Sequence, residues 1–397
     1  MPGPEFGIRP RGLCRGAALT LVFAGALATV STTGPWVYDD EPQPASAVRP
    51  ATAHASRGEA ARASADAVAR AAADAVADGK SGKKAAEAAV SRSGDRWGAV
   101  YGPAEYEDFE QSLDGEYTGV GLVAKRCADG RVQVERVRPG GPAARAGLRR
   151  GDALRGIDGR AVDRRPVTEV VALLRGDGLG AAAGTPVRIT LQRGAKVWTQ
   201  EVRRANLPTD AVTVENLADG AVLIKVTSFT RGSGQRVREA VRGAPAGKGV
   251  LLDLRGNEGG LVDEAVTVAA TFLDGGLVAT YEDHGRQRAL HAERGGDLAR
   301  PLVVLVDGGT MSAAELVTGA LADRGRVLTV GSRTFGKGSV QKPRRLADGS
   351  VAELTVGHYR TPAGRDLDGR GITPDLVETE RARERAEAVL SGLQGGS

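Results

Sequence analysis

An alternation of apolar strands with helical segments constrains the fold most. Between residues 221 and 331, runs rich in β-branched residues are separated by segments with helical spacing, such as VDEAVTVAATFL and SAAELVTGALAD. Strands that are apolar throughout are buried on both faces, and strand–helix alternation is typical of a layered α/β sheet. The sequence therefore predicts an α/β core at 205–376 and a C-terminal helix at 377–397. The expected strands are AVLIKVTSF, GVLLDLR, LVATYED, PLVVLVD and RVLTVG.

A second block, residues 114–204, has shorter strand-like runs separated by glycine and proline turns, with one helix expected at 167–174. Within it YTGVGL (117–122) precedes GPAARAGLRRGDALRGIDGRAV (141–162), and together they closely resemble a PDZ domain. Such a glycine-loosened loop can point several backbone N–H groups at a peptide's terminal carboxylate, while the peptide adds a strand beside it. The residues expected to bind the peptide are Gly119, Val120, Gly121, Leu122, Val171 and Leu174.

The first 37 residues have the form of a secretory signal or a membrane anchor. Arg9, Arg11 and Arg15 precede the apolar run AALTLVFAGALATV, whose position and charge asymmetry favour a signal over a buried core helix. The run is short for a span of about 20 residues, although extension through 34–37 would make an uncleaved anchor. We therefore expect an extracytoplasmic protein, secreted or held at the cytoplasmic membrane. A linker at 38–56 then leads into an N-terminal helical region at 57–113, whose last helix is expected at 103–113.

Composition excludes several classes of function. Of the two cysteines, Cys14 lies in the targeting segment, which leaves Cys127 without a disulfide partner, and the four histidines are scattered. The net charge of +5 is spread without the basic clusters and stacking aromatics that nucleic-acid binders use. We expect no metal, no cofactor and no nucleic-acid partner.

The segment VVLVDGGTMSAAELVTGALADRG (303–325) carries the first candidate for chemistry. A strand ends at Asp307, two glycines follow, and Ser312 stands where a helix begins. There its hydroxyl faces unpaired N–H groups, and the N–H of Ala313 could stabilise an oxyanion formed by attack on a carbonyl. An ordinary N-cap serine is the alternative, because Glu315 completes a capping-box pattern.

A distant segment, GSRTFGKGSVQ (331–341), decides between these interpretations. It resembles a phosphate-binding loop, but Gly338 follows Lys337 where that loop needs Ser or Thr. With residues 303–325, 249–266, 357–376 and 97–122, it resembles the tail-specific or carboxy-terminal processing peptidases, a family of serine peptidases with a Ser-Lys dyad. The resemblance covers roughly residues 95–376.

This resemblance implies the roles of the site residues and a crotonase- or ClpP-like layered α/β peptidase core with an inserted PDZ domain. Ser312 is the nucleophile, Lys337 the general base and Gln341 the residue that orients the lysine amine. The oxyanion hole uses the N–H of Ala313 with that of Gly259 or Gly260, a choice that the sequence leaves open. A supporting shell is formed by Arg255, Glu315, Asp323 and Thr334.

The chain departs from the family pattern in the glycine loop, where Asn-Asn-Pro is replaced by Gly256-Asn257-Glu258. The flank of the serine also differs, but no reacting group is lost. The resemblance implies protein substrates with exposed C-terminal tails, and it leaves a regulatory partner and oligomerisation open. Two other classes of function are weighed: a catalytically silent PDZ binding protein or chaperone, and an acyl-transfer enzyme of the crotonase type, which would need a coenzyme A site.

Overall fold

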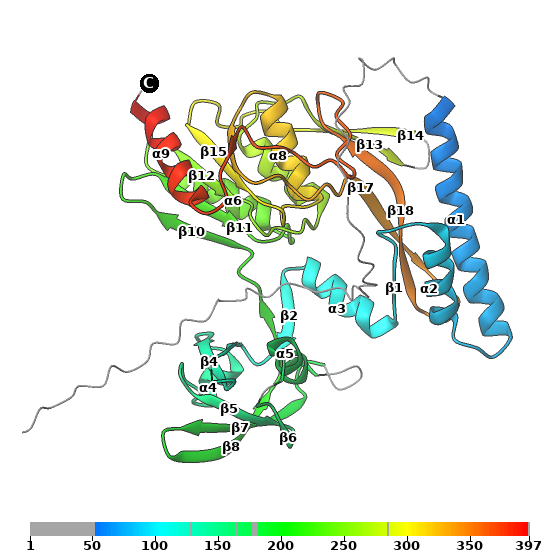
Figure 1. The fold of residues 1–397 in the computed structure, drawn as a ribbon, viewed down its shortest axis with the longest axis vertical. Coiled ribbons are helices and arrows are strands. Elements are labelled where there is room, and N and C mark those ends of the chain that lie inside the picture. The colour runs from blue at the N-terminus through cyan, green and yellow to red at the C-terminus, as the bar shows by residue number, and fades with distance from the viewer. Residues whose placement is uncertain (1–51, 128, 164, 177–181, 284–285, 396–397) are drawn as a thin grey trace, which may run out of the picture. The chain divides into compact units, whose positions relative to one another are not determined.

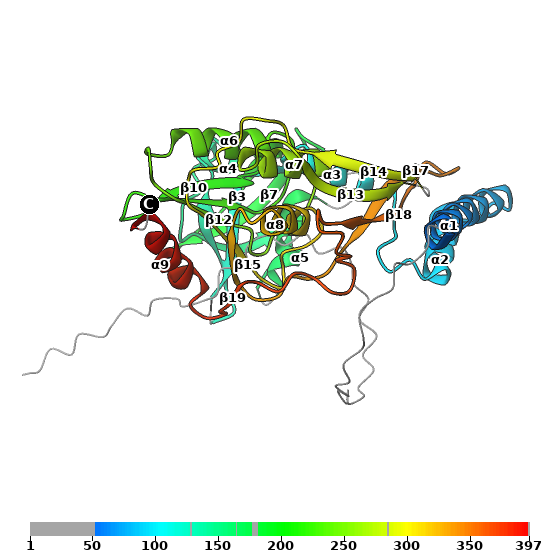
Figure 2. The ribbon, with the colours of Figure 1, turned by 90° about the horizontal axis from the view of Figure 1, so that it is seen from above.

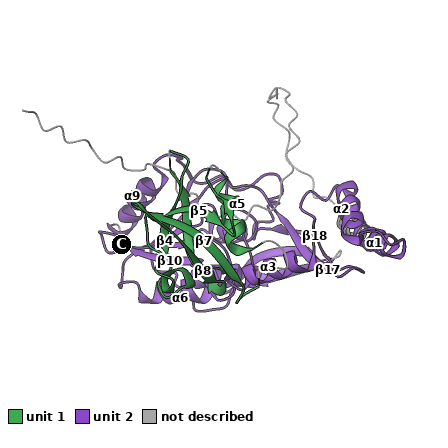
Figure 3. Cartoon of the chain, turned by 90° about the horizontal axis from the view of Figure 1, so that it is seen from below, with its two compact units in different colours: residues 1–48, 118–207 green, residues 49–117, 208–397 purple. Residues whose placement is uncertain are grey.

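The computed structural model describes residues 52–395, apart from 128, 164, 177–181 and 284–285. The chain divides into two compact units (Figure 3): a small unit, of which residues 118–207 are described, and a large unit that contains residues 49–117 and 208–397. The predicted signal or anchor at 1–37 lies outside the described residues. No helix in the described ranges is long and apolar enough to cross a membrane.

The large unit is built on a six-stranded sheet with the order β10-β11-β12-β15-β16-β19 (Figure 1). The strands are Val212–Asn216 (β10), Val222–Val226 (β11), Val250–Asp253 (β12), Leu302–Val306 (β15), Leu328–Gly331 (β16) and Leu376–Val377 (β19). Only the β10–β11 pair is antiparallel in this sheet. Every residue of β12 and β15 is buried, as their largely apolar runs predict. The α/β layer expected from the alternation is confirmed.

Helices cover both faces of this sheet. Three of them, α6 (Ser233–Gly243), α7 (Val262–Thr271) and α8 (Ala313–Asp323), pack over one face in the main hydrophobic core. The last helix, α9 (Ala382–Gly395), covers the other face, and Figure 2 shows α8 and α9 on opposite sides of β12 and β15. Because side chains alternate along a strand, Leu252 contacts the first core and Leu251 the second.

A second, antiparallel sheet adjoins the first within the large unit. Its order is β1-β18-β13-β14, and β17 pairs with β18 as well. The bounds are Ala99–Tyr101 (β1), Leu277–Asp283 (β13), Arg286–His291 (β14), Ser339–Arg345 (β17) and Val351–Arg360 (β18). The sequence placed LVATYED in the α/β layer, and this is wrong, because β13 belongs to the second sheet. Its second half is polar and only partly buried, so it could not lie between two helical layers.

The N-terminal helical region packs on this second sheet. Helices α1 (Thr52–Ala77) and α2 (Gly82–Ser93) form a small core with Leu346, Ala352 and Leu354, and they lie beside β18 (Figure 1). The predicted helix at 103–113 is confirmed as α3 (Pro103–Leu113), which starts with proline at its first position, where no N–H is needed.

The small unit is a β structure with its own core. Its sheet has the order β3-β4-β5-β7-β8, with β6 paired to β5, so that β3 is an edge strand. The strands are Leu122–Arg126 (β3), Val132–Val137 (β4), Ala153–Ile157 (β5), Arg160–Ala161 (β6), Pro186–Arg193 (β7) and Lys196–Arg203 (β8). A short helix α4 (Pro142–Arg145) and the longer α5 (Val167–Arg175) complete it, and the predicted helix at 167–174 is confirmed. The chain enters through β2 (Glu116–Gly119) and leaves through β9 (Ala205–Pro208), which pair with each other.

Candidate active site

Three loops meet at the carboxyl ends of the parallel strands, where open α/β sheets place their functional residues. They follow β12, β15 and β16, and they carry the glycine pair, the serine and the lysine singled out from the sequence. A Cβ atom added to Gly259 would lie 3.0 Å from Cβ of Ser312 and 3.2 Å from N of Ala313. The N–H of Met311 donates to the carbonyl of Asn257 at 2.8 Å. The glycine loop and the serine loop are therefore in direct contact.

Ser312 has a backbone conformation that side chains rarely adopt. Its φ of 52° is positive, a property that it shares only with Asp158 among the described non-glycine residues. It is partly exposed and immediately precedes α8, and its N–H donates to Oε2 of Glu315 at 3.1 Å. Ser312 thus occupies the N-cap position that the alternative interpretation expected. Backbone strain of this kind costs about 1–3 kcal/mol and concentrates at functional sites, which an ordinary cap does not require.

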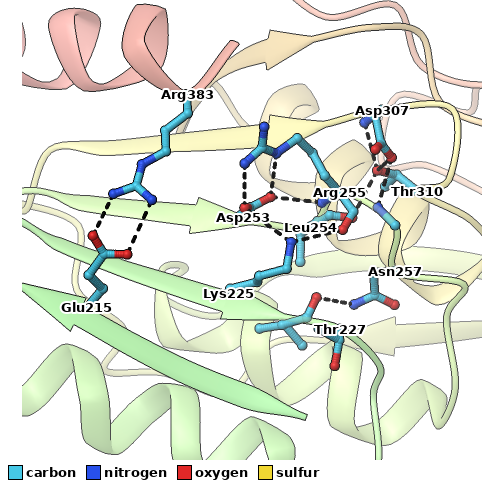
Figure 4. Close-up of polar contacts among 12 residues, drawn as sticks. Glu215, Lys225, Thr227, Asp253, Leu254, Arg255, Asn257, Asp307, Thr310 and Arg383 are labelled. Atoms are coloured by element: carbon cyan, nitrogen blue, oxygen red, sulfur yellow. Dashed lines mark hydrogen bonds and ion pairs between the residues drawn. The ribbon is translucent and has the colours of Figure 1, made fainter. Parts of the chain in front are cut away.

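Asn257 shapes the glycine loop from a fully buried position. Its Nδ2 donates to the carbonyl of Val226 at 3.0 Å (Figure 4), and its Oδ1 accepts the N–H of Gly259 at 2.8 Å. The N–H groups of Gly260 and Ala313, in contrast, donate to no other residue that the structure describes. Of the two glycines that the sequence left open, only Gly260 therefore keeps its N–H available, and Gly260 is exposed.

Asp307 holds the serine loop against the glycine loop. Its Oδ1 accepts the N–H groups of Gly256 and Gly309, each at 2.9 Å (Figure 4). Thr310 closes the same turn, since its hydroxyl donates to the carbonyl of Leu254 at 3.0 Å and accepts the N–H of Asp307 at 2.9 Å. Neither Asp307 nor Thr310 had a role predicted from its sequence. An aspartate that ends a strand before two glycines is a signal for such a turn.

Glu315 joins the serine loop to the lysine loop. This carboxylate is completely buried on the first turn of α8. It accepts the hydroxyl of Thr334 at 2.5 Å and the N–H groups of Gly336 and Lys337 at 2.8 Å each, in addition to the N–H of Ser312. Such bonds to a charged group are stronger than neutral ones. One buried carboxylate thereby fixes the backbone on both sides of the predicted dyad.

The amine of Lys337 lies over an aromatic ring. Its Nζ is 5.1 Å from the ring centroid of Trp97. No hydrogen bond joins it to Ser312 or to Gln341 among the residues described here. Burial lowers the pKa of Lys337 below its ordinary value, and the nearby carboxylates of Glu353, Glu258 and Asp95 oppose that shift without reversing it. The structure thus gathers the dyad residues without connecting their reacting atoms.

Gln341 is held by a chain of hydroxyl and carboxylate groups. Its Nε2 donates to Oγ of Ser339 at 2.7 Å and to Oγ1 of Thr355 at 3.4 Å. The Thr355 hydroxyl in turn donates to Oδ1 of Asp95 at 2.8 Å. The contacts of Asp95, Trp97 and Thr355 could not be predicted from the sequence, since nothing in their local sequence indicates that they lie beside Lys337.

The remaining predicted shell residues lie at the margins of the site. Arg255 forms a bidentate pair with the buried carboxylate of Asp253, through Nε at 2.9 Å and an Nη at 2.8 Å, and Lys225 reaches the same carboxylate at 3.4 Å (Figure 4). Asp323, at the end of α8, accepts the N–H of Ala363 at 2.8 Å and pairs with Arg365. Both stabilise loops around the site, and neither contacts Ser312 or Lys337 through a hydrogen bond in the described chain.

The predicted peptide-binding residues of the small unit lie around the open edge of β3. Gly121 has φ of 76°, as the loosened loop requires. The carbonyls of Val120 and Gly121 are bonded to the N–H groups of Ala143 and Arg138, while their own N–H groups donate to no other described residue. Val120 and Leu174 are buried in the core of the unit, whereas Leu122 and Val171 are partly exposed and remain available to line a groove.

Family models match both units. A model described as peptidase family S41 matches residues 221–378, and one described as PDZ domain matches residues 133–193. The carboxy-terminal processing protease CtpA of Bacillus subtilis (strain 168) is 30% identical over 300 residues, which make up 74% of this chain and 62% of that protein. A probable CtpA-like serine protease of Staphylococcus aureus (strain COL) is 30% identical over 308 residues, or 75% of this chain and 60% of that protein.

The chain thus spans about three fifths of the length of the curated relatives it matches. Among solved structures, a photosystem II D1 C-terminal processing protease is 31% identical and aligns over 75% of this chain and 82% of that chain, with a TM-score of 0.47.

Proposed function

The chain belongs to peptidase family S41, with the PDZ-containing carboxy-terminal processing peptidases, and from this premise we propose that it is a serine endopeptidase with a Ser312–Lys337 dyad. The observation that carries the proposal is the meeting of three loops at one point. Ser312, in a strained conformation at the start of α8, abuts Gly259 and is tied to the backbone of Lys337 through Glu315.

The dyad performs acyl transfer in two steps. Neutral Lys337 takes the proton of the Ser312 hydroxyl while Oγ attacks the carbonyl carbon of the scissile bond. The tetrahedral intermediate collapses as Lys337 returns the proton to the leaving amine, which leaves an acyl-enzyme on Ser312. A water molecule then attacks the ester, again with Lys337 as base, and releases the acid product.

The site offers support for the two main requirements of this mechanism, a neutral base and donors for the oxyanion. Burial favours the neutral amine, because it lowers the pKa of Lys337. The N–H groups of Ala313 and Gly260 are the donors we assign to the oxyanion hole, since neither is used elsewhere in the described chain. Two such donors are worth several kcal/mol when charge develops on the oxygen.

The dyad must rearrange before it can react. Proton transfer needs Nζ of Lys337 about 2.6–3.2 Å from the serine oxygen. With the amine over Trp97, Lys337 must turn away from that ring and toward Ser312. Gln341, which now donates to Ser339, then orients the amine through its carbonyl oxygen. The arrangement in the structure is a resting form of the dyad in this proposal.

The small unit supplies substrate recognition. An exposed C-terminal tail binds as an extra strand along the open edge of β3, with its carboxylate at the free N–H groups of the Val120–Gly121 loop. Tethering a substrate in this way raises its local concentration at the dyad. The substrates are therefore proteins with exposed, apolar C-terminal tails. We place the enzyme outside the cytoplasm, on account of the signal- or anchor-like sequence at its N-terminus.

A cleavage assay on an unfolded protein with an apolar C-terminal tail tests this function. Wild type is compared with Ser312→Ala and Lys337→Met, and with the surface controls Ser91→Ala and Lys342→Met. We expect both dyad variants to lose activity and both controls to keep it. Equal cleavage by all five proteins would exclude the dyad. If wild type binds tail peptides and never cuts, the chain is instead a PDZ binding protein.

A further inference from the structure

A large aromatic side chain is exposed beside the dyad. Phe335 is 43% exposed, although it lies between residues whose positions are fixed. Its own N–H donates to the carbonyl of Thr310 at 3.1 Å, and its neighbours Thr334 and Gly336 are bonded to the buried carboxylate of Glu315. Leaving a phenyl ring partly in water forgoes stabilisation that burial would provide. The fold therefore holds this ring in place at the surface of the site.

Trp97 stands next to it and comes from a segment that precedes the small unit in the chain. The two ring centroids are 5.6 Å apart with an interplanar angle of 59°. Oδ1 of Asp95 accepts the N–H of Trp97 at 3.1 Å, and both carboxylate oxygens of Asp95 are bonded to Thr355 of β18 at 2.8 Å. The turn that carries Trp97 is thus anchored to the sheet that also carries Gln341.

The indole of Trp97 also has an unsatisfied hydrogen-bond donor. Its Nε1 is buried and has no hydrogen-bond partner among the described residues. An unpaired buried donor destabilises this arrangement, so the ring gains from any shift that brings it an acceptor, such as the backbone of a bound peptide. Since Nζ of Lys337 lies over the same ring, such a shift occurs at the predicted base itself.

We propose that Trp97 and Phe335 form the wall of a substrate subsite that receives an aliphatic or aromatic side chain flanking the scissile bond. The proposal rests on the function proposed above and adds the residues that choose the cleavage position. It assigns to the peptidase unit a selectivity of its own, separate from recognition of the tail by the small unit.

The charges around the two rings select the class of side chain. The guanidinium of Arg96 lies 4.4 Å from the Trp97 ring centroid, so a basic side chain would meet a cation beside the rings. The carboxylates of Glu258, Glu353 and Asp95 interact with Lys337, and they repel an acidic side chain. Large neutral side chains bury apolar area against the rings without either repulsion.

Peptide cleavage tests the selectivity. A peptide series varies the residue on each side of the scissile bond among Leu, Phe, Ser, Lys and Glu, and kcat/KM is measured for each. We expect wild type to prefer Leu or Phe over Ser at one position by about 10- to 100-fold. Phe335→Ala and Trp97→Ala should bring that ratio close to one, while Trp97→Phe retains part of it. A ratio of two peptides cancels any general loss of activity in a variant.

A control and a stability measurement complete the series. Leu298→Ala removes a side chain that is 57% exposed and has no role in this proposal, so its ratio should equal that of wild type. Thermal unfolding shows whether each variant is folded. Two results would overturn the subsite and leave the proposed function standing. The first is a wild type that cuts all peptides of the series equally well. The second is an unchanged preference in folded Phe335→Ala and Trp97→Ala.

A binding measurement separates the subsite from catalysis. The three tryptophans are Trp36, Trp97 and Trp198, so the variant Ser312→Ala/Trp36→Phe/Trp198→Phe reports fluorescence from Trp97 alone. Peptides with amidated C-termini are used, because they lack the carboxylate that the PDZ loop binds. We expect Leu- or Phe-containing peptides to shift the Trp97 emission and Ser, Lys or Glu peptides to require at least about tenfold higher concentration.

The outcomes of this titration are distinct from those of the cleavage assay. An emission shift in a chain that never cuts proteins would support the subsite as a peptide-binding site and reject the peptidase. The subsite would be overturned if no peptide shifted the emission at concentrations that saturate wild type in the cleavage assay. If wild type does not cut, the titration is carried to millimolar concentration.

Discussion

Lys337 is the residue whose charge decides whether the proposed dyad can react. Its pKa is lowered mainly because burial disfavours the ammonium, and the carboxylates around it restore only part of the shift. The neutral amine is the base, so kcat/KM should rise with pH through this lowered pKa and then level off. Lys337→Arg, which stays protonated, should lose about 10²- to 10⁴-fold. A pH–rate profile on a short amidated peptide measures both effects, and a rate that falls as pH rises would contradict them.

The same shift has a consequence for stability. In the unfolded chain the lysine keeps its ordinary, higher pKa, so between the two pKa values the unfolded state binds more protons than the folded state. The free energy of unfolding therefore receives a contribution that increases as pH rises through this window. Lys337→Met should remove that contribution and leave the stability flatter with pH over the same range. Urea unfolding of both proteins at several alkaline pH values measures the difference.

Gly259 is a position at which an added Cβ atom would disturb the nucleophile. Its φ is 105°, and a Cβ there would press on Cβ of Ser312 at 3.0 Å and on N of Ala313 at 3.2 Å. Gly259→Ala should lower kcat by about 10²-fold or more, as loss of an oxyanion donor does, because the added methyl displaces the serine and its neighbouring N–H. Steady-state kinetics on the peptide used above gives the value.

Gly256 provides the matched control in the same loop. Its φ of 68° is also positive, but nothing lies within 4 Å of an added Cβ. Gly256→Ala therefore carries the backbone strain without the collision, and it should keep most of the activity while losing about 1 kcal/mol or more of stability. If both alanine variants lost activity equally, strain in the loop, rather than crowding at Ser312, would be the cause.

At the scale of elements, Glu315 links helix α8 to the loop before β17 by hydrogen bonds. Its buried carboxylate accepts four hydrogen bonds, from Ser312, Thr334, Gly336 and Lys337. Glu315→Gln keeps the shape of the side chain and removes its negative charge. It also replaces one accepting carboxylate oxygen by an NH2 group, which faces other donors. We expect the free energy of unfolding to fall by about 2–4 kcal/mol, since bonds to charged groups contribute about 1.5–3 kcal/mol each. Activity should fall further than stability alone explains.

Denaturant unfolding and peptide cleavage, measured on the same preparation, test this prediction. Glu293→Gln is the control, because the Glu293 side chain is 79% exposed and pairs only at the surface with Arg238. That substitution should change stability by less than about 0.5 kcal/mol. A Glu315→Gln protein as stable and active as wild type would show that the loops are held together by packing alone.

For the whole molecule, the open question is how far the small unit controls the peptidase unit. Val171 is partly exposed on α5 beside the edge strand β3, whereas Ala172, the next residue, is exposed to solvent. Val171→Glu places a charge where an apolar tail should pack. It should raise KM for a protein with a free apolar tail by about tenfold or more, and it should leave cleavage of a short amidated peptide unchanged.

Ala172→Glu adds the same charge about 100° around the helix axis, at a solvent-exposed position, and should have no effect on either substrate. Comparing the two variants on tailed and amidated substrates separates tail recognition from catalysis. If Val171→Glu slowed both substrates equally, the small unit would act on the dyad itself rather than on substrate binding.

The sequence by itself determined the elements whose patterns are local. Largely apolar runs such as GVLLDLR and PLVVLVD favour burial on both faces, and the parallel sheet follows from them. Helices α3 and α5 were placed to within a residue, because proline and amphipathic spacing mark them. The resemblance to the processing peptidases also rested on short motifs, and the family comparisons confirm it. The roles of Ser312, Lys337 and Gln341 remain predictions that the experiments above address.

Only the tertiary structure decided what surrounds those motifs. It moved β13 into a second sheet, because a half-polar strand cannot be buried on both faces. It brought Trp97 under Lys337 and placed Asp95 against Thr355, across some 240 and 260 positions of sequence, with no local pattern to announce either contact. It showed that Asn257 occupies the N–H of Gly259 and leaves that of Gly260 free. A local pattern determines which face of an element is buried, but the partner of a given side chain depends on how distant segments pack.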